Sequence, residues 1–354
     1  MIPAMFKVLS YSLLAAMMVP ALPRAAAAQV YPERIRAVER ARVVSAAYQR
    51  RTRDDNREEQ TERTTRTLKL GANGVLTLAN IAGDIVVTRA GGSEVTVEIV
   101  KTARGKSVED AREQIRLVQV EVTERSGRAE IRTRYPNNDG NNRRNFSTSV
   151  DYIVSAPAGT RVSIASISGT IKVTDLKGEV SANSVSGDVR LTGAGRVSEA
   201  KSISGTVEIV DAQVDGALDS SSVSGDVILR RVNARQLDAS SVSGNVKFDD
   251  VQCDHVSANS ISGTVALVGS LARNGRYELK SFSGDVHLYL SGGTGFEIDA
   301  NSSSGEVRSD FDIVTRGSNT TRRGRRTVLT GTFGDGSAVL DLTTFSGSII
   351  ISKR

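Results

Sequence analysis

The residues with the clearest potential for chemistry are Asp285, His287 and Glu306. Asp285 and Glu306 each follow the glycine of a Ser-X-Ser-Gly tetrapeptide, and alternation along a strand puts His287 on the same side as Asp285. Two carboxylates that face a glycosidic bond can act as general acid and as base or nucleophile. A polysaccharide-cleaving site in consecutive repeats is therefore one hypothesis for this chain.

The whole column of residues that follow the glycines favours a structural role instead. Equivalent positions in stacked strands lie about 4.8 Å apart, and two carboxylates that close repel by about 1 kcal/mol even in a water-like dielectric. Neutral residues separate the acids everywhere except at Asp285 and Glu306, as a solvated ladder requires. We therefore expect no catalytic residue in this column, which reads Thr170, Asp188, Thr206, Asp226, Asn245, Thr264, Asp285, Glu306 and Ser348.

Cys253 is the only cysteine, so the chain cannot form an intramolecular disulfide. His255 lies two residues further on, but one cysteine and one histidine make a poor ligand set for a metal. The sequence also has no Gly-x-Ser-x-Gly elbow, phosphate-binding loop or His-Glu-x-x-His motif. We expect no metal, no cofactor and no enzyme activity.

A basic cluster is the remaining candidate site, and its arginines are Arg322, Arg323, Arg325 and Arg326. The formal net charge is +6, and this cluster lies in an expected insertion around residues 315–327. It is a candidate for binding envelope glycans or anionic cell-surface polymers, although a solvated loop is the favoured interpretation. Export and an aromatic content of only 4% argue against a nucleic-acid partner.

The element that must position all these residues is the tetrapeptide itself, because it recurs at nearly constant spacing. From glycine to glycine the steps are 18, 18, 20, 19, 19, 21, 21 and then 42 residues. A fixed period near 20 indicates a solenoid, in which one repeat cannot bury its apolar face alone. The copies begin at Ser166, Ser184, Ser202, Ser222, Ser241, Ser260 and Ser281, with weaker copies at Ser302 and Thr344.

Alternation predicts at least two strands and two corners in each coil of about 19–21 residues. It places Val185, Gly187, Val189 and Leu191 in the core and Ser184, Ser186, Asp188 and Arg190 in solvent. A turn is expected at Asn183-Ser184, and the inward glycine indicates close backbone approach or a positive φ. The expected fold is all-β, a right-handed parallel β-solenoid. A left-handed, three-sided helix of hexapeptides is the alternative, which the steps of 19–21 disfavour.

Serine fills nearly every position beside the X residue, although serine is a poor strand former. The favoured explanation is that its hydroxyls bond along the ladder and cap the corner. The alternative is a flat hydroxyl surface that binds glycans or another repetitive ligand.

The region before the repeats divides into three expected segments. Residues 1–28 combine Lys7, an apolar stretch and a run of alanines, so they predict a signal peptide with cleavage before Gln29. Residues 29–66 form a charged, Arg-rich linker or helix. Residues 67–160 form a small β-rich region with one helix from Ser107 to about Leu117, and the repeats occupy residues 161–352. No cysteine offers a lipid anchor after the apolar run, and no later stretch predicts a membrane span.

The order of these motifs resembles the bacterial "putative adhesin" β-strand-repeat family. The resemblance rests on Ile81–Ile85, on Ala156–Thr160 before the first repeat, on the serial Ser-Val-Ser-Gly-Asp-Val units and on Leu340–Ile349. It covers roughly Glu59 to Lys353 and implies a solenoid without catalytic residues. We expect a non-enzymatic, exported protein of the periplasm, cell surface or medium, acting as an adhesin or scaffold. The alternatives are a polysaccharide-active β-helix enzyme and a signalling partner in envelope stress that contacts another envelope protein.

Overall fold

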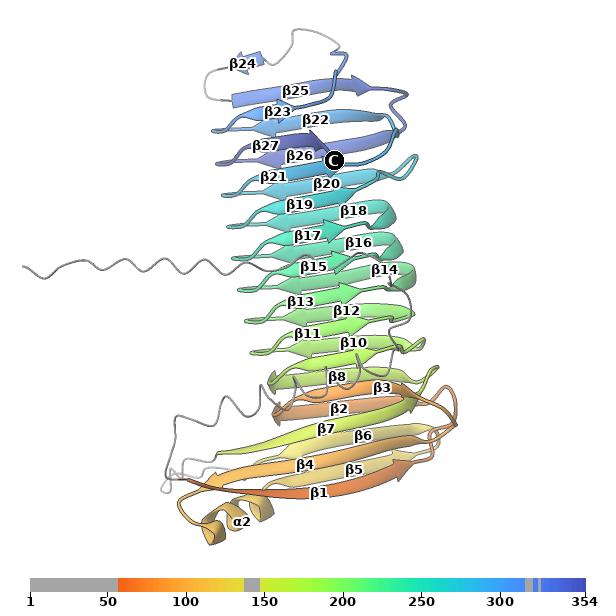
Figure 1. Ribbon diagram of the computed structural model, residues 1–354, viewed down its shortest axis with the longest axis vertical. Coiled ribbons are helices and arrows are strands. Elements are labelled where there is room, and N and C mark those ends of the chain that lie inside the picture. Colours follow the sequence, from red (N-terminus) through yellow and green to blue (C-terminus); the bar gives the residue numbers. More distant parts are fainter. Residues whose placement is uncertain (1–56, 137–146, 316–320, 324–325) are drawn as a thin grey trace, which may run out of the picture. The chain divides into compact units, whose positions relative to one another are not determined.

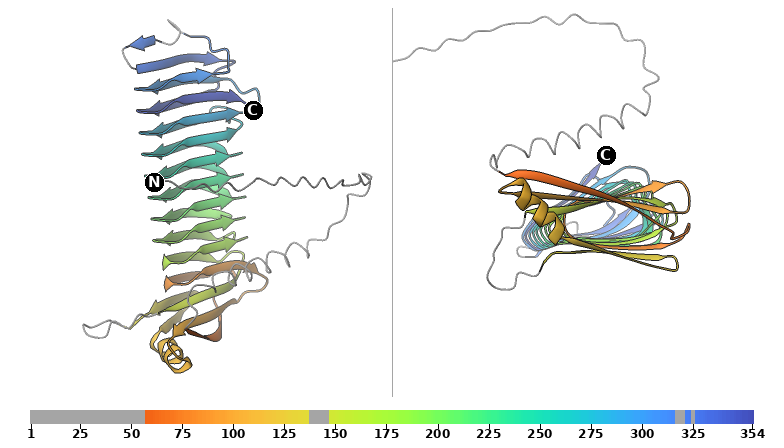
Figure 2. Two further views of the ribbon diagram at one scale, coloured as in Figure 1. Left: turned by 60° about the vertical axis from the view of Figure 1, so that its left-hand side comes forward. Right: turned by 90° about the horizontal axis from the view of Figure 1, so that it is seen from below.

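The fold is two long β-sheets that face each other across a thin core (Figures 1 and 2). The computed structural model describes residues 57–136, 147–315, 321–323 and 326–354, which belong to one compact unit. The predicted signal peptide and most of the predicted charged segment, residues 1–56, lie outside the described residues. Within each sheet, strands from successive coils pair mostly in parallel, which confirms the predicted β-solenoid.

Within the residues that the structure describes, sheet A has 13 strands and sheet B has 14. In spatial order, sheet A contains β1 (Glu58–Leu68), β4 (Val95–Gly105), β7 (Thr148–Pro157), β3 (Ile85–Ala90), β9 (Ile171–Thr174), β11 (Val189–Thr192), β13 (Val207–Val210), β15 (Val227–Arg230), β17 (Val246–Asp249), β19 (Val265–Gly269), β21 (Val286–Leu290), β27 (Ile349–Lys353) and β23 (Val307–Ser309). Sheet B contains β24 (Thr321–Arg323), β25 (Arg326–Phe333), β22 (Phe296–Ser302), β26 (Ala338–Thr344), β20 (Arg276–Ser281), β18 (Gln252–Ser260), β16 (Asn233–Ser241), β14 (Gln213–Ser222), β12 (Arg196–Ser202), β10 (Glu179–Ser184), β8 (Arg161–Ser168), β2 (Val75–Ala82), β6 (Arg128–Arg134) and β5 (Gln119–Arg125).

Each regular coil consists of one strand of sheet B, a Ser-X-Ser-Gly corner and one strand of sheet A. The valines that begin the sheet A strands stack in register and are fully buried, as predicted: Val189, Val207, Val227, Val246, Val265 and Val286. Two strands per coil rule out the three-sided hexapeptide alternative. Right-handed winding stays a prediction.

The β-rich region before the repeats is continuous with the solenoid. Strands β2 and β3 form a coil of their own, because β2 pairs with β8 and β3 pairs with β9. The predicted helix is α2 (Val108–Leu117), whose N-terminal Asp110 amide donates to the Ser107 hydroxyl. Strands β5 and β6 form an antiparallel hairpin in the same region.

The predicted charged linker or helix needs one correction at its end. Glu58–Arg66 belongs to β1, an edge strand paired antiparallel with β4. Its burial pattern is largely exposed. The segment does not resemble a strand in sequence, because most of its residues are charged or threonine and few are apolar. Backbone pairing with β4 stabilises it, rather than burial of its own side chains.

The last coils do not stack in sequence order, which corrects the predicted sequential array. Strands β26 and β27 lie between the coil of β20 and β21 and the coil of β22 and β23. The hairpin of β24 and β25 then pairs antiparallel with β22 and covers that edge of sheet B (Figure 1). Phe296, Phe311 and Phe333 pack together at this end with ring centroids 4.9–5.3 Å apart.

Candidate functional site

The geometry of the Ser-X-Ser-Gly corner is set by its first serine, which points inward. The Ser222 hydroxyl donates to the Gly205 carbonyl of the preceding coil at 2.9 Å and accepts from the Gly225 amide at 3.0 Å. The same hydroxyl-to-carbonyl bond is made by Ser202, Ser241, Ser260, Ser281, Ser302 and Thr344. Each bond satisfies a buried polar group and joins two coils. The favoured explanation of the serines, capping of the corner, is confirmed for these seven members of the first column, whereas the buried hydroxyls of Ser166 and Ser184 have no hydrogen-bond partner.

The glycines of the corner stack directly on one another. A Cβ built on Gly225 would lie 2.1 Å from the Gly205 carbonyl oxygen, and the same clash recurs at Gly244 and Gly263. Close backbone approach therefore explains the glycine, as the sequence predicts. Positive φ is needed only at the first two corners, at Gly83 and Gly169.

The X residue of the tetrapeptide points outward, so the predicted parity of Val185 and Ser184 is wrong. Strand β10 continues through Ser184, and alternation from Val180 and Ala182 turns that serine inward. The turn follows at Val185–Asp188 rather than at Asn183-Ser184. Ser184 is 6% exposed and Val185 is 40% exposed.

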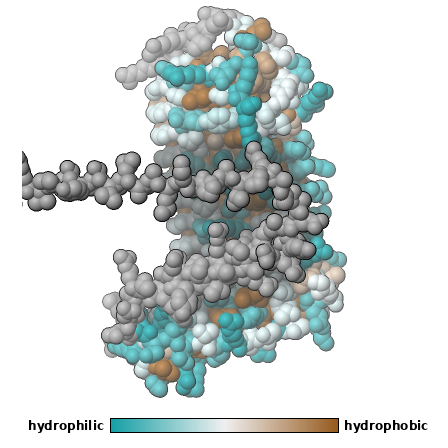
Figure 3. Space-filling view, in the orientation of Figure 1, coloured by the Kyte–Doolittle hydropathy of each residue, from teal (hydrophilic) through white to brown (hydrophobic). Residues whose placement is uncertain are grey.

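One exposed apolar side chain therefore emerges from nearly every coil, and we call this set the corner column. It lies where the sheet B strands end and the sheet A strands begin, along the left edge in Figure 1. In spatial order its members are Ile81, Ile167, Val185, Ile203, Val223, Val242, Ile261, Phe282 and Phe345, and they are 36–55% exposed. Hydrophobic residues also emerge among polar ones in the space-filling view (Figure 3).

Two open grooves run beside the corner column. One, of about 610 Å³, is lined by Ile81, Ile167, Val185, Ile203 and Val223 together with polar residues of sheet B. The other, of about 500 Å³, is lined by Val242, Ile261, Phe282 and Phe345 in the same way. The molecule thus presents an apolar ridge with a shallow trough along its length.

The residues on both sides of the column are polar, and the lysines among them are paired with nearby carboxylates. On the sheet B side, the Lys201 ammonium lies 2.7 Å from a Glu199 carboxylate oxygen and 2.8 Å from Asp219. The hydrogen bonds that the Lys201 ammonium donates to Asp219 and then to Glu199 raise the pKa of Lys201, so it stays charged and paired. Lys280 is likewise paired with Glu278. On the other side, the second serines of the tetrapeptides, such as Ser224 and Ser243, are exposed.

The hypothetical catalytic acids are not neighbours. The inserted coil places Ser348 between them: the Ser348 amide donates to the Asp285 carboxylate at 2.7 Å, and the Ile349 amide donates to the Glu306 carbonyl at 2.8 Å. Neutral residues therefore separate the acids along the whole column, including the one place where the sequence order predicts contact. The His287 Nε2 atom lies 3.8 Å from an Asp285 carboxylate oxygen, and its Nδ1 atom lies 3.3 Å from the Tyr289 hydroxyl oxygen.

The acids that follow the glycines have a structural task. A carboxylate oxygen of Asp188 accepts from the Thr206 amide at 2.9 Å, and Asp226 accepts from the Asn245 amide at 2.8 Å. Each acid thus satisfies a backbone N–H of the next coil at the point where the ladder is interrupted by the corner. This role requires a single acceptor side chain one coil away from each backbone N–H, and it does not require two acids to lie close together.

Cys253 and His255 do not form a ligand pair. The buried Cys253 thiol donates to the His255 backbone carbonyl at 3.0 Å, and burial raises its pKa to about 11. Across the ranges that the structure describes, no three side chains of His, Cys, Asp and Glu gather in a way that could hold a metal. In the same ranges, no helix is long and apolar enough to cross a membrane.

The basic cluster falls on the terminal hairpin. Arg322 and Arg323 lie on β24, Arg326 begins β25, and Arg323 pairs with Arg326 across the hairpin. Arg325 lies outside the described residues. Polyanion binding by this cluster stays a prediction.

The corner column was missed because a hydrophobic residue flanked by serines reads as an inward strand position. The available signal was the X position itself: eight of the nine tetrapeptides carry Ile, Val or Phe there, although a corner favours polar residues.

Comparison with known proteins finds one matching family and several similar solved structures. A family model described as "Toastrack DUF4097" matches residues 75–352. Among solved structures, the chain is similar to a "putative adhesin" from Bacteroides fragilis NCTC 9343, with 14% identity, 83% of this chain and 97% of that chain covered, and a TM-score of 0.39. It is similar to a "putative adhesin" from Parabacteroides merdae ATCC 43184, with 10% identity, coverage of 83% and 96%, and a TM-score of 0.43. It is also similar to a "putative lipid binding protein" from Parabacteroides distasonis ATCC 8503, with 14% identity, coverage of 83% and 97%, and a TM-score of 0.43. No curated protein matches the chain.

Proposed function

The chain belongs to the toastrack DUF4097 family, and on that premise we propose that it is a non-enzymatic scaffold of the bacterial envelope that binds its partner along the corner column. The observation that carries this proposal is the repetition of one half-exposed apolar side chain per coil in a straight line. Nothing in the hydrogen bonding of the corner requires an apolar residue at X, because its side chain points to solvent.

The physical character of the column suits binding. Soluble monomers rarely expose contiguous apolar patches larger than a few hundred Å², and larger ones mark interaction surfaces. Most of its members are valine or isoleucine, whose side chains have few rotamers to lose on binding. Because the corner backbone is held by bonds such as Ser224 N to Ile203 O at 2.8 Å, the side chains project from a rigid frame.

The enzyme alternative has less support. No catalytic activity is known for this family. The one acid pair that sequence order suggests, Asp285 and Glu306, is divided by Ser348. Glycosidases need two carboxyl groups on opposite sides of one bond, and these two acids instead belong to a ladder of backbone acceptors.

Export is part of the proposal. Residues 1–28 have the pattern of a secretory leader, and mature protein would begin at Gln29 in the periplasm, at the cell surface or in the medium. Mass spectrometry of protein recovered from cell fractions tests this directly. A mass that retains Met1, or that carries an acyl group, would refute it.

Binding along the column is tested by co-sedimentation of the purified protein with envelope fractions. A column variant carries Val185→Ser, Ile203→Ser, Val223→Ser and Val242→Ser, all at exposed positions. A matched control carries Ser186→Ala, Ser204→Ala, Ser224→Ala and Ser243→Ala in the second, also exposed, serine column. We expect the column variant to lose at least tenfold in binding and the control to bind as the unmodified protein does.

The reverse result would favour the other hypothesis of the sequence analysis, a hydroxyl surface for glycans. Equal binding by all three proteins would reject the corner column as the functional surface. Circular dichroism and thermal unfolding of both variants show whether the fold is intact, which the exposure of all eight positions predicts.

A further inference from the structure

The occupant of the corner column can be inferred from its length, its period and its flanks. The column spans nine coils, which at about 4.8 Å per coil gives a strip roughly 38 Å long. At 36–55% exposure we estimate its open apolar area at roughly 700 Å², close to the about 800 Å² per partner of a standard protein interface. A partner that covers it must therefore be long and straight.

The period of the column is selective. Its side chains repeat at the spacing between hydrogen-bonded strands, about 4.8 Å, because each comes from the next strand of sheet B. A single extended peptide alternates side chains at about twice its rise of 3.3 Å per residue, so it falls out of step within a few coils. A second stack of β-coils has the same period and stays in step along its whole length.

The flanks also permit a second copy to approach. Lys201 is neutralised by Glu199 and Asp219, and Lys280 is paired with Glu278. The second serines on the opposite flank are uncharged and exposed. The charges on the sheet B flank are therefore already paired within one copy. Beyond the serines, the carboxylates of Asp188, Asp226 and Asp285 accept from backbone amides of the next coil, and the troughs beside the column leave room for the partner's side chains.

We propose that the corner column is the interface of a homodimer, in which two solenoids associate edge to edge around a two-fold axis. Two-fold association uses the same patch on both copies, so a single self-complementary column is sufficient. The inference rests on the proposed function, since it names the partner of the same surface. In this dimer the corner column of one copy packs into the grooves beside the corner column of the other copy.

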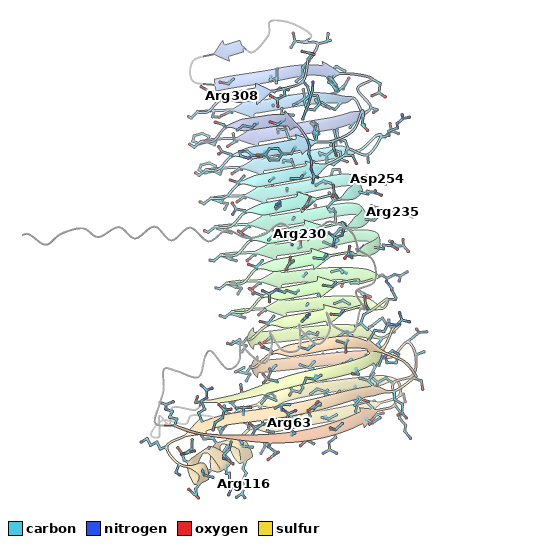
Figure 4. All side chains as sticks on the ribbon, viewed as in Figure 1. Arg63, Arg116, Arg230, Arg235, Asp254 and Arg308 are labelled. Carbon is cyan, nitrogen blue, oxygen red and sulfur yellow. The ribbon has the colours of Figure 1, made fainter. Side chains whose placement is uncertain are left out.

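Sedimentation velocity of the mature protein between about 0.1 and 100 μM tests the proposal. The unmodified protein and the second-serine control should sediment as dimers at the upper concentrations, and the column variant should remain monomeric at every concentration. A cysteine at the middle of the column, Val223→Cys, should form a disulfide between copies under mild oxidation. A cysteine at the opposite edge, Arg235→Cys, should not (Figure 4).

The native Cys253 should not interfere, because it is 3% exposed. A monomeric unmodified protein, with no disulfide at Val223→Cys, would overturn the dimer. If the column variant then still lost envelope binding, or lost binding to phospholipid vesicles, the proposed function would stand with a different occupant. If it lost neither, both proposals would fail.

Discussion

Phe282 and Phe345 stack with ring centroids 5.0 Å apart and planes within 3° of each other, although another complete coil lies between them in the sequence. The stack exists because β26 is inserted beside β20, ahead of β22. The same insertion moves Glu306 away from Asp285 and continues the corner column by one more apolar residue. One change in strand order thus separates the two acids that the sequence order places together and lengthens the exposed apolar column.

Replacing an inward and an outward valine of one coil with aspartate tests the revised parity. Val227 is fully buried, so Val227→Asp should destabilise the fold by several kcal/mol, because it buries an unpaired charge. Val223 is 43% exposed, and Val223→Asp should change the stability of the monomer by about 0.5 kcal/mol or less. Urea unfolding at a concentration where the protein is monomeric measures both. Equal losses would show that both side chains are buried.

The two serines of a single corner should differ in the same way. Ser222→Ala removes a hydroxyl that donates to Gly205 and accepts from Gly225, and should cost about 1–3 kcal/mol. Ser224→Ala changes an exposed side chain and serves as the control. The free energy of unfolding of each variant decides the matter, and a larger loss for Ser224→Ala would contradict the corner geometry.

Gly225→Ala should be more disruptive than its small volume suggests. The added methyl group would lie 2.1 Å from the Gly205 carbonyl oxygen, and only a shift of the backbone between coils can relieve that contact. We expect a loss of at least about 1–3 kcal/mol. Gly91→Ala is the control, because a Cβ there meets nothing within 4 Å and Gly91 has no positive φ. Similar unfolding midpoints for the two variants would refute the stacked glycine column.

Cys253 should react very slowly with alkylating reagents in the native protein. Burial raises the pKa of its thiol to about 11, so the thiolate is scarce at pH 8, whereas an unfolded thiol with a pKa of about 8.5 is partly ionised. We expect alkylation at pH 8 to be at least 100-fold slower in buffer than in denaturant. Rapid labelling of folded protein would contradict the burial of this residue.

The same shift has a consequence for stability. The native state holds the Cys253 proton more tightly than the unfolded state does, so this group's contribution is full below about pH 8.5 and is lost as the pH rises toward about 11. Cys253→Ala should remove that part of the pH dependence. An unchanged pH profile in this variant would show that the thiol ionises equally in both states.

Much of the fold follows from periodicity. The spacing of the glycines predicts coils, and alternation after each glycine, as in Val189 and Leu191, correctly predicts the strands of sheet A. Helix α2 and the β5–β6 hairpin follow from local signals, a capping serine at Ser107 and a Ser126-Gly127 turn. These features depend on residues close together in the chain.

Two predictions were wrong, the inward orientation of the X residue and the sequential order of the last coils. Both involve contacts between coils, which the sequence of a single coil does not show. The orientation of the first serine follows from the strand that precedes it, because β10 continues through Ser184 and turns it inward. In later coils the inward hydroxyl, as at Ser222, also bonds to the glycine carbonyl of the preceding coil, a contact that the sequence of one coil does not show. The position of β26 depends on pairing between strands distant in sequence, which the repeat spacing cannot order. Both errors bear on the corner column: its sequence signal is the apolar residue at X, but the outward orientation and the order of these residues follow only from the stacked coils.

The most direct test of the corner column as a binding edge is the rate at which maleimide labels Val223→Cys, measured in dilute isolated protein and again after the protein is bound to envelope material or concentrated to about 100 μM. Position 223 should label rapidly in the dilute protein and at least tenfold more slowly in either bound state, whereas Arg235→Cys should label at the same rate throughout. Slow labelling of the dilute protein would contradict the outward orientation of the column. Equal rates in all states would contradict its role in binding.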